Sequence, residues 1–257
     1  MLPTIEHTAV RATLAGGRHL GERFRANDAD GEFSAHDVKA AADRASEERM
    51  LGVVEEAFPD HAVYSEERGE GGGEGDYRWI VDPLDGTNNF VAGMPSFASA
   101  ATVLDSGDPV VASVYAPVAD DLYVARWGGG VEYDGETVET GSDRAPSEAT
   151  VGFVVGHGVK LDPDRAERAH AVRTALEDRC KRVVESWSPT VHWGLLARGR
   201  IDAMVSLSPD REEQYAGELL AREAGAVARE DGPLGVFAAN ESLCDSCWQA
   251  ADSGEDQ

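Results

Sequence analysis

Two segments near the N-terminus carry apolar residues at helical spacing. Over residues 4–25 the spacing is loose, and a Gly-Gly pair at 16–17 argues against one continuous helix. Over residues 37–57 small and aliphatic side chains line one side, and a Phe-Pro pair at 58–59 ends the pattern. The sequence therefore predicts a regular helix over 37–57 and a less regular helical segment before it.

Short apolar runs separated by turn residues then indicate β-structure. Such runs cover 62–64, 77–82, several stretches within 97–126, and the residues on both sides of Asp134-Gly135. Between the first two runs lies RGEGGGEGD (68–76), which is acidic, rich in glycine and without apolar positions. We expect this stretch to be a flexible loop with solvated carboxylates.

The second half of the chain shows a different pattern, in which strand-like and helical segments alternate. The strand-like runs are VGFVVG (151–156), KRVVES (181–186) and IDAMVSL (201–207), and helices are expected over 162–179, 190–199 and 214–224. A polar, proline-containing stretch at 141–150 separates the two patterns. We therefore expect an N-terminal α+β half, 1–140, and a C-terminal α/β half, 141–257.

The charge balance bears on what the protein contacts. The chain has 48 acidic and 23 basic residues and a net charge of −25, and its lysines are Lys39, Lys160 and Lys181. An acidic surface repels nucleic acids and anionic membranes, so we expect neither as a partner. Abundant acid with little lysine is also typical of proteins that work in multimolar salt, so we expect a halophilic protein; an ordinary acidic cytosolic protein is the alternative.

The sequence shows no sign of a membrane or secretory segment. No stretch approaches the roughly 18 apolar residues that span a bilayer. The first residues, MLPTIEHTAVRATLAGG, lack a basic start followed by a continuous apolar block. Three cysteines do not make a disulfide framework, and Cys244-Asp-Ser-Cys247 lacks the second pair of a zinc site. We expect a soluble, cytoplasmic protein in which Cys244 and Cys247 are small, semi-buried residues.

The stretch WIVDPLDGTNNF (79–90) places two aspartates, Asp82 and Asp85, at the end of a buried strand. Two carboxylates about 4 Å apart repel by about 4 kcal/mol at an effective dielectric constant near 20, so we expect a cation between them. Glu66 ends the preceding strand, and antiparallel pairing of the two strands would bring it beside Asp82. With the carbonyl of Leu84 these groups form a set of hard oxygen ligands suited to Mg²⁺ or Mn²⁺ rather than zinc. For the D-P-L-D residues alone, a capped turn is the alternative.

Gly86 and Thr87 follow the second aspartate directly. Their backbone N–H groups could form a helix N-terminus or a nest that faces the metal ions and attracts an anion. A divalent metal beside free N–H donors is a phosphate site, and phosphoester hydrolysis is the reaction that such a site serves best.

These motifs together resemble the inositol monophosphatase-like family of Mg²⁺-dependent, often lithium-inhibited sugar-phosphate phosphatases, which also includes archaeal fructose-1,6-bisphosphatases. WIVDPLDGTNNF matches the family's W-I-x-D-P-[LI]-D-G-T-x-N-F nearly residue for residue. Four further segments are similar to family motifs: SEERG to its E-E motif, HDVKAAADRASE to a helix that carries an aspartate (here Asp43), GGGVEYDGETV to a glycine-rich hairpin, and AGELLAREAGA to a C-terminal helix. The resemblance implies the family's layered αβαβα sandwich, a fold of the α+β / α/β class.

Carried over by position, the resemblance assigns roles to the motif residues. It implies that Glu66, Asp82 and the Leu84 carbonyl bind a first metal ion. It further implies that Asp82 and Asp85 share a second ion with a carboxylate that precedes the last family helix.

The same resemblance implies how substrate and water are held. Gly86 and Thr87 would bind phosphate through their N–H groups. The Thr87 hydroxyl, paired with Asp43, would orient and deprotonate a metal-activated water, and Glu66 would also take part in catalysis. Two or three Mg²⁺ ions, with Mn²⁺ as a substitute, and a homodimer are implied as well.

Some positions depart from the family pattern. Counting back from AGELLAREAGA places the last metal ligand at Glu213, where the family has an aspartate; Asp210, a helical turn earlier, is the less favoured substitute. The family's G-S-A-A segment is Trp-Ser-Pro-Thr here (187–190), and Ser206 stands where inositol phosphatases have a substrate-binding glutamate. We expect Ser188 and Ser206 to contact the substrate.

Several histidines and tryptophans fall outside the matched motifs: His157, His170, His192, Trp187 and Trp193. We expect the histidines to be surface or helix-packing residues. The tryptophans are expected to pack in the core or an interface, with stacking on a sugar or adenine ring as the alternative.

We therefore predict a Mg²⁺-dependent phosphatase that hydrolyses a phosphomonoester of a small metabolite by metal-activated water. Inositol monophosphate, fructose 1,6-bisphosphate and a nucleotide-like 3′-phosphate are the candidate substrates. The N-terminal half would carry the metal site, and the C-terminal half the last metal ligand and the substrate contacts. The alternative is a catalytically degenerate family member that binds phosphate ligands or partner subunits without turnover, as the changes at Glu213, Ser206 and 186–193 suggest.

Overall fold

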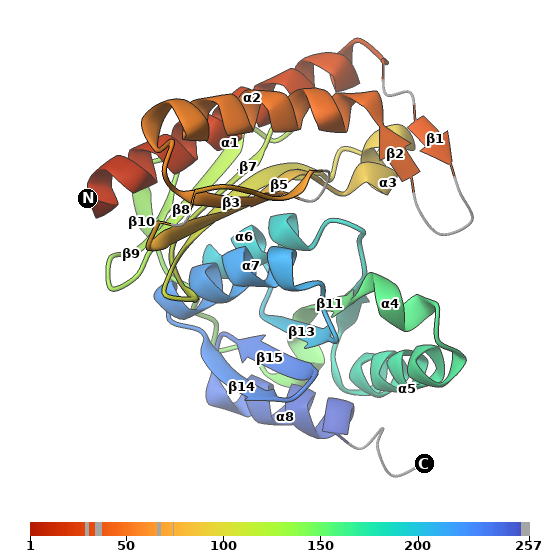
Figure 1. Cartoon of the computed structure of the whole chain (residues 1–257). Coiled ribbons are helices and arrows are strands. Elements are labelled where there is room, and N and C mark those ends of the chain that lie inside the picture. The colour runs from red at the N-terminus through yellow and green to blue at the C-terminus, as the bar shows by residue number, and fades with distance from the viewer. Residues whose placement is uncertain (29–30, 34–37, 66–67, 74, 253–257) are drawn as a thin grey trace.

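The computed structural model describes residues 1–28, 31–33, 38–65, 68–73 and 75–252. Helices and sheets alternate in five layers (Figure 1). In order, the layers are α1 (Leu2–Arg25) with α2 (Ala41–Ala57), an eight-stranded sheet, α6 (Pro189–Ala197) with α7 (Arg211–Glu223), a five-stranded sheet, and α5 (Pro163–Arg179) with α8 (Glu241–Asp252). The expected αβαβα sandwich is confirmed.

A hydrophobic core lies on each side of each sheet. The first joins α1 and α2 to the large sheet, the second joins α6 and α7 to both sheets, and the third joins the small sheet to α5 and α8. Fully buried representatives of the three cores are Trp79, Trp193 and Leu176. Because both faces of each central strand are covered, the strands have nearly uninterrupted apolar sequences.

The first helix is continuous, and the interruption expected at its Gly-Gly pair is wrong. Both glycines are buried. A Cβ on Gly16 would lie 2.5 Å from Oγ of Ser46 on α2, and a Cβ on Gly17 would lie 2.5 Å from Cδ1 of the sheet residue Tyr115. The pair therefore lets α1 pack closely on its neighbours, which offsets the low helix propensity of glycine.

The eight-stranded sheet has the order β10-β9-β8-β7-β6-β5-β3-β4. Its strands are β3 (Ala62–Ser65), β4 (Gly69–Gly72), β5 (Tyr77–Asp85), β6 (Ala98–Asp105), β7 (Asp108–Ala116), β8 (Asp121–Arg126), β9 (Gly130–Tyr133) and β10 (Glu136–Val138). The turn at Asp134-Gly135 joins β9 and β10, as the sequence predicts.

The strands β3 and β5 run parallel, so the antiparallel pairing expected for them is wrong. The reason is β4, which pairs antiparallel with the other edge of β3 and reverses the chain once more before β5. This strand lies inside the stretch 68–76 that was expected to be a loop. Since β4 is rich in glycine and largely exposed, it has no apolar pattern by which the sequence could indicate it.

Two short strands precede the second helix. β1 (Gly31–Phe33) and β2 (Val38–Ala40) form an antiparallel pair. The helix α2 therefore begins at Ala41, four residues later than expected from the apolar pattern.

The five-stranded sheet has the order β12-β11-β13-β15-β14. Its strands are β11 (Thr150–Val155), β12 (Arg182–Val184), β13 (Ala203–Leu207), β14 (Val227–Asp231) and β15 (Leu234–Ala238), and the short helices α3 (Thr87–Val91), α4 (His157–Lys160) and η1 (Pro146–Glu148) complete the described elements. β11 is parallel to β12 and β13, in agreement with the expected alternation of strand and helix. The helix α7 begins at Arg211, so Glu213 lies in its first turn.

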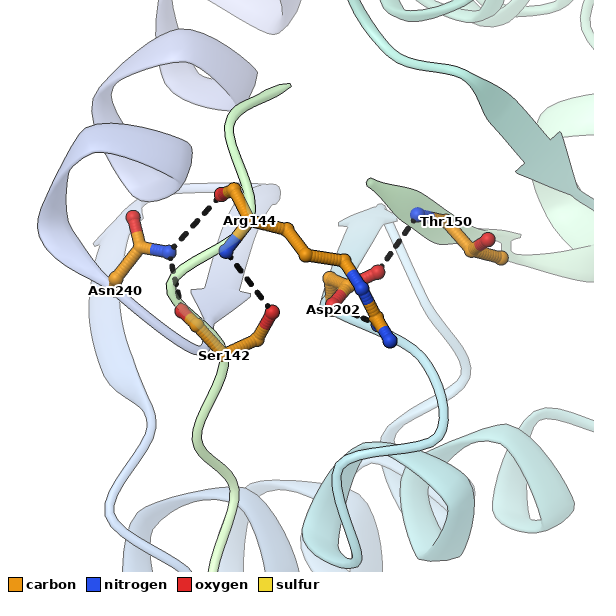
Figure 2. A network of polar contacts seen from close by, with 5 residues as sticks. All are labelled: Ser142, Arg144, Thr150, Asp202 and Asn240. Atoms are coloured by element: carbon orange, nitrogen blue, oxygen red, sulfur yellow. Dashed lines mark hydrogen bonds and ion pairs between the residues drawn. The ribbon is translucent and has the colours of Figure 1, made fainter. Parts of the chain in front are cut away.

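Polar contacts fix the linker between the two sheets (Figure 2). The buried Asp202 accepts hydrogen bonds from Nη1 of Arg144 at 2.9 Å and from the N–H of Thr150 at 2.8 Å. On the other side of the linker, Nδ2 of Asn240 donates to the carbonyl of Ser142 at 2.7 Å. We propose that the two halves of the chain divide at this anchored segment.

None of the described helices is both long and apolar enough to cross a membrane. Cys180, Cys244 and Cys247 are free thiols, and all three are buried. Cys244 and Cys247 are therefore more enclosed than the semi-buried positions expected for them.

Candidate metal and phosphate site

The strand β5 changes register between its two motif aspartates. Asp82 pairs with Ala100 of β6, whereas Asp85, three residues later, pairs with Ala98, only two residues away. In a regular strand, side chains three positions apart point to opposite faces, so the extra residue turns both carboxylates to the same side. The N–H of Leu84 donates to Oδ1 of Asp82 at 3.1 Å and supports this bend.

Glu213 completes an acidic cluster with these aspartates. One carboxylate oxygen from each of Asp82, Asp85 and Glu213 lies within 4.8 Å of the other two. The aspartates are buried and the glutamate is half-buried. Since carboxylates so close repel one another without a cation, the cluster could hold a metal ion.

Asp85 is hydrogen-bonded through one oxygen only. Its Oδ2 accepts from the Ser188 hydroxyl at 2.6 Å, from the N–H of Thr190 at 3.1 Å and from the Thr190 hydroxyl. Its Oδ1 is buried and has no hydrogen-bond partner among the described residues. Burial raises the pKa of Asp85 to about 6, and the hydrogen bonds from Ser188 and Thr190 oppose that rise. The residues present therefore fit a metal ion, because a cation would supply the partner that Oδ1 lacks.

Ser188 and Thr190 stand at the start of α6. The structure turns the Ser188 hydroxyl to Asp85, and Ser188 is not among the residues that line the adjacent cavity. Thr190 was not anticipated, because its contact with Asp85 spans 105 residues of chain. The Ser-Pro-Thr sequence is typical of a helix start, which signals the local structure but not the carboxylate that it holds.

Gly86 and Thr87 lie where β5 ends and α3 begins. Gly86 has a φ of 91°, in the left-handed region that favours glycine, and a Cβ there would lie 2.9 Å from Cβ of Ser188. The Thr87 hydroxyl donates to the carbonyl of Leu84 at 3.1 Å. The close approach of Ser188 thus requires glycine at position 86.

A cavity of about 430 Å³ lies against the acidic cluster. The expected site residues on its wall are Asp82, Leu84, Asp85, Gly86, Thr87 and Glu213. The wall also includes residues from the second half of the chain, among them His157, Lys160 and Trp187. The volume suits a small metabolite.

The remaining expected residues lie away from this wall or outside the described residues. Asp43 is buried in the first turn of α2. Ser206 is buried in β13, where its hydroxyl accepts from Nε2 of Gln214 at 3.4 Å, and it does not line the cavity. Glu66 lies outside the described residues.

Asp210, the residue before α7, also lines the cavity, but its side chain makes no capping hydrogen bond to that helix and lies outside the acidic cluster. Its Oδ2 accepts from the N–H of His157 at 2.9 Å, so it ties α4 to α7. Of the two carboxylates considered for the last ligand position, Glu213 is therefore the one in the acidic cluster.

Glu47 is a buried carboxylate that the sequence analysis did not single out. It accepts hydrogen bonds from the Ser65 hydroxyl and from the N–H of Arg68 at 3.1 Å, and it is ion-paired with the Arg68 side chain at 3.3 Å. It thus joins α2 to the end of β3. Its spacing of four residues from Asp43 on one helix was the available signal.

The two unassigned tryptophans lie in different environments. Trp193 is fully buried in the core between the sheets, and its indole atoms lie 2.3 Å from the position of a Cβ on Gly217. Trp187 is 46% exposed and lies on the cavity wall. Trp193 therefore packs in the core, whereas Trp187 is exposed to the cavity, where a ligand could contact it.

Comparison with known sequences assigns the chain to a family. A sequence model of the Inositol monophosphatase family matches residues 2–250. The chain belongs to this family.

Two relatives of this inositol monophosphatase family member carry different names. It is 32% identical over 250 residues to the fructose-1,6-bisphosphatase/inositol-1-monophosphatase of Aquifex aeolicus, covering 93% of this chain and 92% of that protein. It is 29% identical over 225 residues to the Nus factor SuhB of Escherichia coli, covering 86% of this chain and 83% of that protein. A phosphatase is therefore plausible, and a non-catalytic role stays open.

Solved structures of the family share the fold. An inositol monophosphatase from Anabaena aligns with a TM-score of 0.83 and 25% identity over 98% of this chain and 96% of that one. The extragenic suppressor protein suhB of Bartonella henselae aligns with a TM-score of 0.87 and 22% identity over 97% of this chain and 99% of that one. The second similarity concerns the fold alone.

Proposed function

We propose that this family member is a Mg²⁺-dependent phosphatase, with Mn²⁺ as a possible substitute, that hydrolyses a phosphomonoester of a small metabolite. The observation that carries the proposal is the buried Oδ1 of Asp85, without a partner among the described residues, in an acidic cluster on the wall of a cavity. Among the described lining residues, Lys160 is the only lysine or arginine, and its ion-pair partner is Glu185. No described side chain of the wall thus neutralises the cluster, which is the environment that a divalent cation requires.

The proposed ligands come from both halves of the chain. Asp82 and Asp85 on β5 and Glu213 on α7 would hold the metal ions, and the family resemblance extends the set to Glu66 and the Leu84 carbonyl. A bound Mg²⁺ would polarise the phosphoryl oxygens and lower the pKa of a water molecule.

Other residues would orient these ligands and the substrate. Ser188 and Thr190 hold one oxygen of Asp85 and favour its charged form, which leaves the other oxygen directed for binding. We propose that the N–H groups of Gly86 and Thr87 bind the phosphate. The family resemblance adds a proton path: the Thr87 hydroxyl would take a proton from the attacking water and pass its own proton to Asp43, which requires that hydroxyl to turn from the Leu84 carbonyl, to which it donates at 3.1 Å.

A phosphate-release screen tests this function. The substrates are inositol 1-phosphate, fructose 1-phosphate, fructose 1,6-bisphosphate, glycerol 2-phosphate and a nucleoside 3′-phosphate, assayed in molar KCl with Mg²⁺ or Mn²⁺. We expect release from at least one substrate and a loss of about 100-fold in Asp85→Asn, because the amide cannot neutralise a cation. Asp108→Asn, an exposed position outside the cavity wall, makes the same chemical change and is expected to keep full activity.

Binding without turnover is the second candidate function. Relatives named Nus factor SuhB and the glutamate at position 213 favour it. Absence of release from every substrate by a folded protein, with calorimetric binding of Mn²⁺ and inorganic phosphate, would establish this function instead.

The proposed partners follow from charge and from the family resemblance. We propose a cytoplasmic protein that binds neither nucleic acid nor membranes, since a net charge of −25 opposes association with polyanions. The homodimer that we also propose rests on the family resemblance alone. Retention of RNA at physiological salt by the wild-type protein would overturn the part that concerns nucleic acid.

A further inference from the structure

One lysine of the cavity wall, Lys160, lies outside the metal and phosphate motifs of the sequence. Lys160 ends α4, and its Nζ lies 3.3 Å from the centroid of the Trp187 ring. The same Nζ lies 3.7 Å from Oε1 of Glu185. All three side chains line the cavity that contains the acidic cluster.

The charge of this lysine is only partly compensated. Its partner Glu185 is shared, because the other carboxylate oxygen is 3.1 Å from Nη1 of Arg173. Arg173 in turn contacts the half-exposed Glu177, which is not a lining residue. Lys160 is therefore the only lysine or arginine on the described wall, and Glu185 compensates its charge only in part.

The ammonium group is held in place without losing its hydrogen-bond donors. The indole face attracts a cation through its π-electrons and accepts no conventional hydrogen bond. The separation of 3.7 Å from Glu185 is also longer than a charge-assisted hydrogen bond, which measures about 2.7–2.9 Å. An anion in the cavity would find donors that are already positioned.

The lysine is structurally connected to the metal end of the cavity. Asp210, the residue before α7, accepts a hydrogen bond from the first residue of α4 at 2.9 Å. Lys160 and Glu213 thus stand on two helices that are fastened to each other. This hydrogen bond links the helix that ends in Lys160 to the helix that carries Glu213.

We propose that Lys160, stacked on Trp187, binds a second anionic group of the substrate, distant from the phosphate that is cleaved. The inference rests on the proposed function and names its substrate class: small phosphomonoesters that carry a further phosphate or carboxylate. A chain with three lysines and a net charge of −25 has placed one of them on the wall of an otherwise acidic cavity. A substrate that is neutral beyond its scissile phosphate would offer Lys160 no second anionic group to bind.

Two matched pairs of substrates test the subsite and distinguish its ligands. Fructose 1,6-bisphosphate against fructose 1-phosphate adds a phosphate, and 2-phosphoglycerate against glycerol 2-phosphate replaces a hydroxymethyl group by a carboxylate. The measured quantity is the ratio of kcat/KM within each pair. We expect Lys160→Gln to lower this ratio by about 10- to 100-fold for at least one pair, mainly through KM, because a hydrogen bond to a charged group is lost.

Matched variants separate the subsite from general electrostatics. Lys181→Gln removes the same charge from an exposed position that does not line the cavity, and it is expected to keep both ratios within about twofold of wild type. Trp187→Leu keeps the lysine but removes the stack, and a smaller fall of the ratio is expected.

The outcomes are distinct. A shift confined to one pair identifies phosphate or carboxylate as the ligand, and both results support the subsite. Release from the monophosphates with ratios that are equal in wild type and Lys160→Gln overturns the subsite and leaves the phosphatase standing. If no substrate is hydrolysed, the phosphatase fails, and calorimetric binding of fructose 1,6-bisphosphate decides the subsite: an unchanged Kd in Lys160→Gln overturns it.

Discussion

Three buried carboxylates of this protein differ in how many of their oxygens have partners. Asp202 is satisfied on both oxygens by Arg144 and Thr150. Glu47 is satisfied by its contacts with β3 and the arginine that follows it. Asp85 has partners on one oxygen only among the described residues. The first two carboxylates therefore stabilise the fold by themselves, whereas Asp85 is arranged for a group that the chain does not supply.

The length of Glu213 is the first property to test at the level of single residues. The family pattern alone favours aspartate at this position, but here the longer side chain already brings its carboxylate within 4.8 Å of both aspartates. Glu213→Asp withdraws it by more than about 1 Å, and we expect kcat/KM to fall about 10- to 100-fold with a weaker response to Mg²⁺.

The neighbouring residue supplies the control for this change. Glu212 lies in the same helical turn and on the same wall but outside the acidic cluster. Glu212→Asp is expected to change kcat/KM by less than about threefold. Equal or higher activity of Glu213→Asp in a Mg²⁺ titration would show that the site retains the family's geometry for an aspartate.

His192 makes the stability of the protein depend on pH. Burial, with a smaller effect of Arg182, lowers its pKa to about 4 from an ordinary 6.5. Because the folded state favours the neutral ring, this contribution is fully present above pH 6.5 and is lost as the pH falls toward 4. Between about pH 7 and pH 5 the wild type should lose about 2 kcal/mol of unfolding free energy from this residue.

Urea titrations at both pH values measure this effect. Asp85, whose pKa burial raises to about 6, titrates in the same window, so the quantity compared is the pH-dependent loss of unfolding free energy in wild type minus the loss in His192→Gln. His170→Gln, at an exposed position, should show the full wild-type loss. An identical loss in His192→Gln and wild type would contradict the prediction.

At the scale of elements, the sequence predicted the pieces that have an apolar pattern and missed those held by distant contacts. The strand β5, the hairpin at Asp134-Gly135 and the helices α5 and α6 could be recognised from local residues. The strand β4 is held by main-chain hydrogen bonds at a sheet edge, and the continuity of α1 depends on Ser46 and Tyr115 lying beside its glycines.

The same limit applies to the candidate site. The carboxylates of the D-P-L-D motif were predictable, because the motif lies in one continuous stretch. Two features were not predictable: the parallel pairing of β3 with β5, and the hydrogen bonds from Thr190 to Asp85. Each joins segments that come together only when the chain folds. Local pattern thus identifies the ligands but not the residues that orient them.

The close packing of α1 on α2 can be tested with two glycine substitutions. Gly16→Ala would place a Cβ 2.5 Å from Oγ of Ser46 and 2.7 Å from Cγ of Met50, so we expect a loss of about 1–3 kcal/mol of unfolding free energy. Gly52→Ala on α2 meets no atom within 4 Å and should gain about 0.5–1 kcal/mol.

Urea unfolding at constant salt compares the two variants. Both replace a helical glycine by alanine, so the difference between them reports packing rather than helix propensity. A gain in Gly16→Ala equal to that in Gly52→Ala would mean that the two helices can separate without cost.

At the scale of the whole molecule, the site is built where the two halves meet. Asp82 and Asp85 belong to the large sheet, whereas Glu213, Ser188 and Thr190 belong to the helices of the middle layer. The acidic cluster therefore assembles only when the layers are docked. Any condition that separates the layers, including repulsion among the surface acids, is expected to weaken metal binding before the sheets themselves unfold.

Repulsion among the surface acids is the property of the whole chain that decides at which salt concentration the layers stay docked. The net charge is −25, and many ion pairs of the described residues join two exposed side chains, each such pair contributing about 0–1 kcal/mol. The range of charge interactions falls from about 30 Å at 0.01 M salt to about 3 Å at 1 M. We therefore expect the helical circular dichroism signal to be retained in multimolar KCl and lost in millimolar buffer.

NaCl at the same ionic strength should substitute for KCl, while sucrose at matched osmolarity should not, because sucrose does not screen charge. Added EDTA in high KCl separates this effect from loss of metal. A spectrum unchanged between molar KCl and millimolar buffer would show that the surface acids are too far apart to destabilise the layers, and that the composition is not an adaptation to salt.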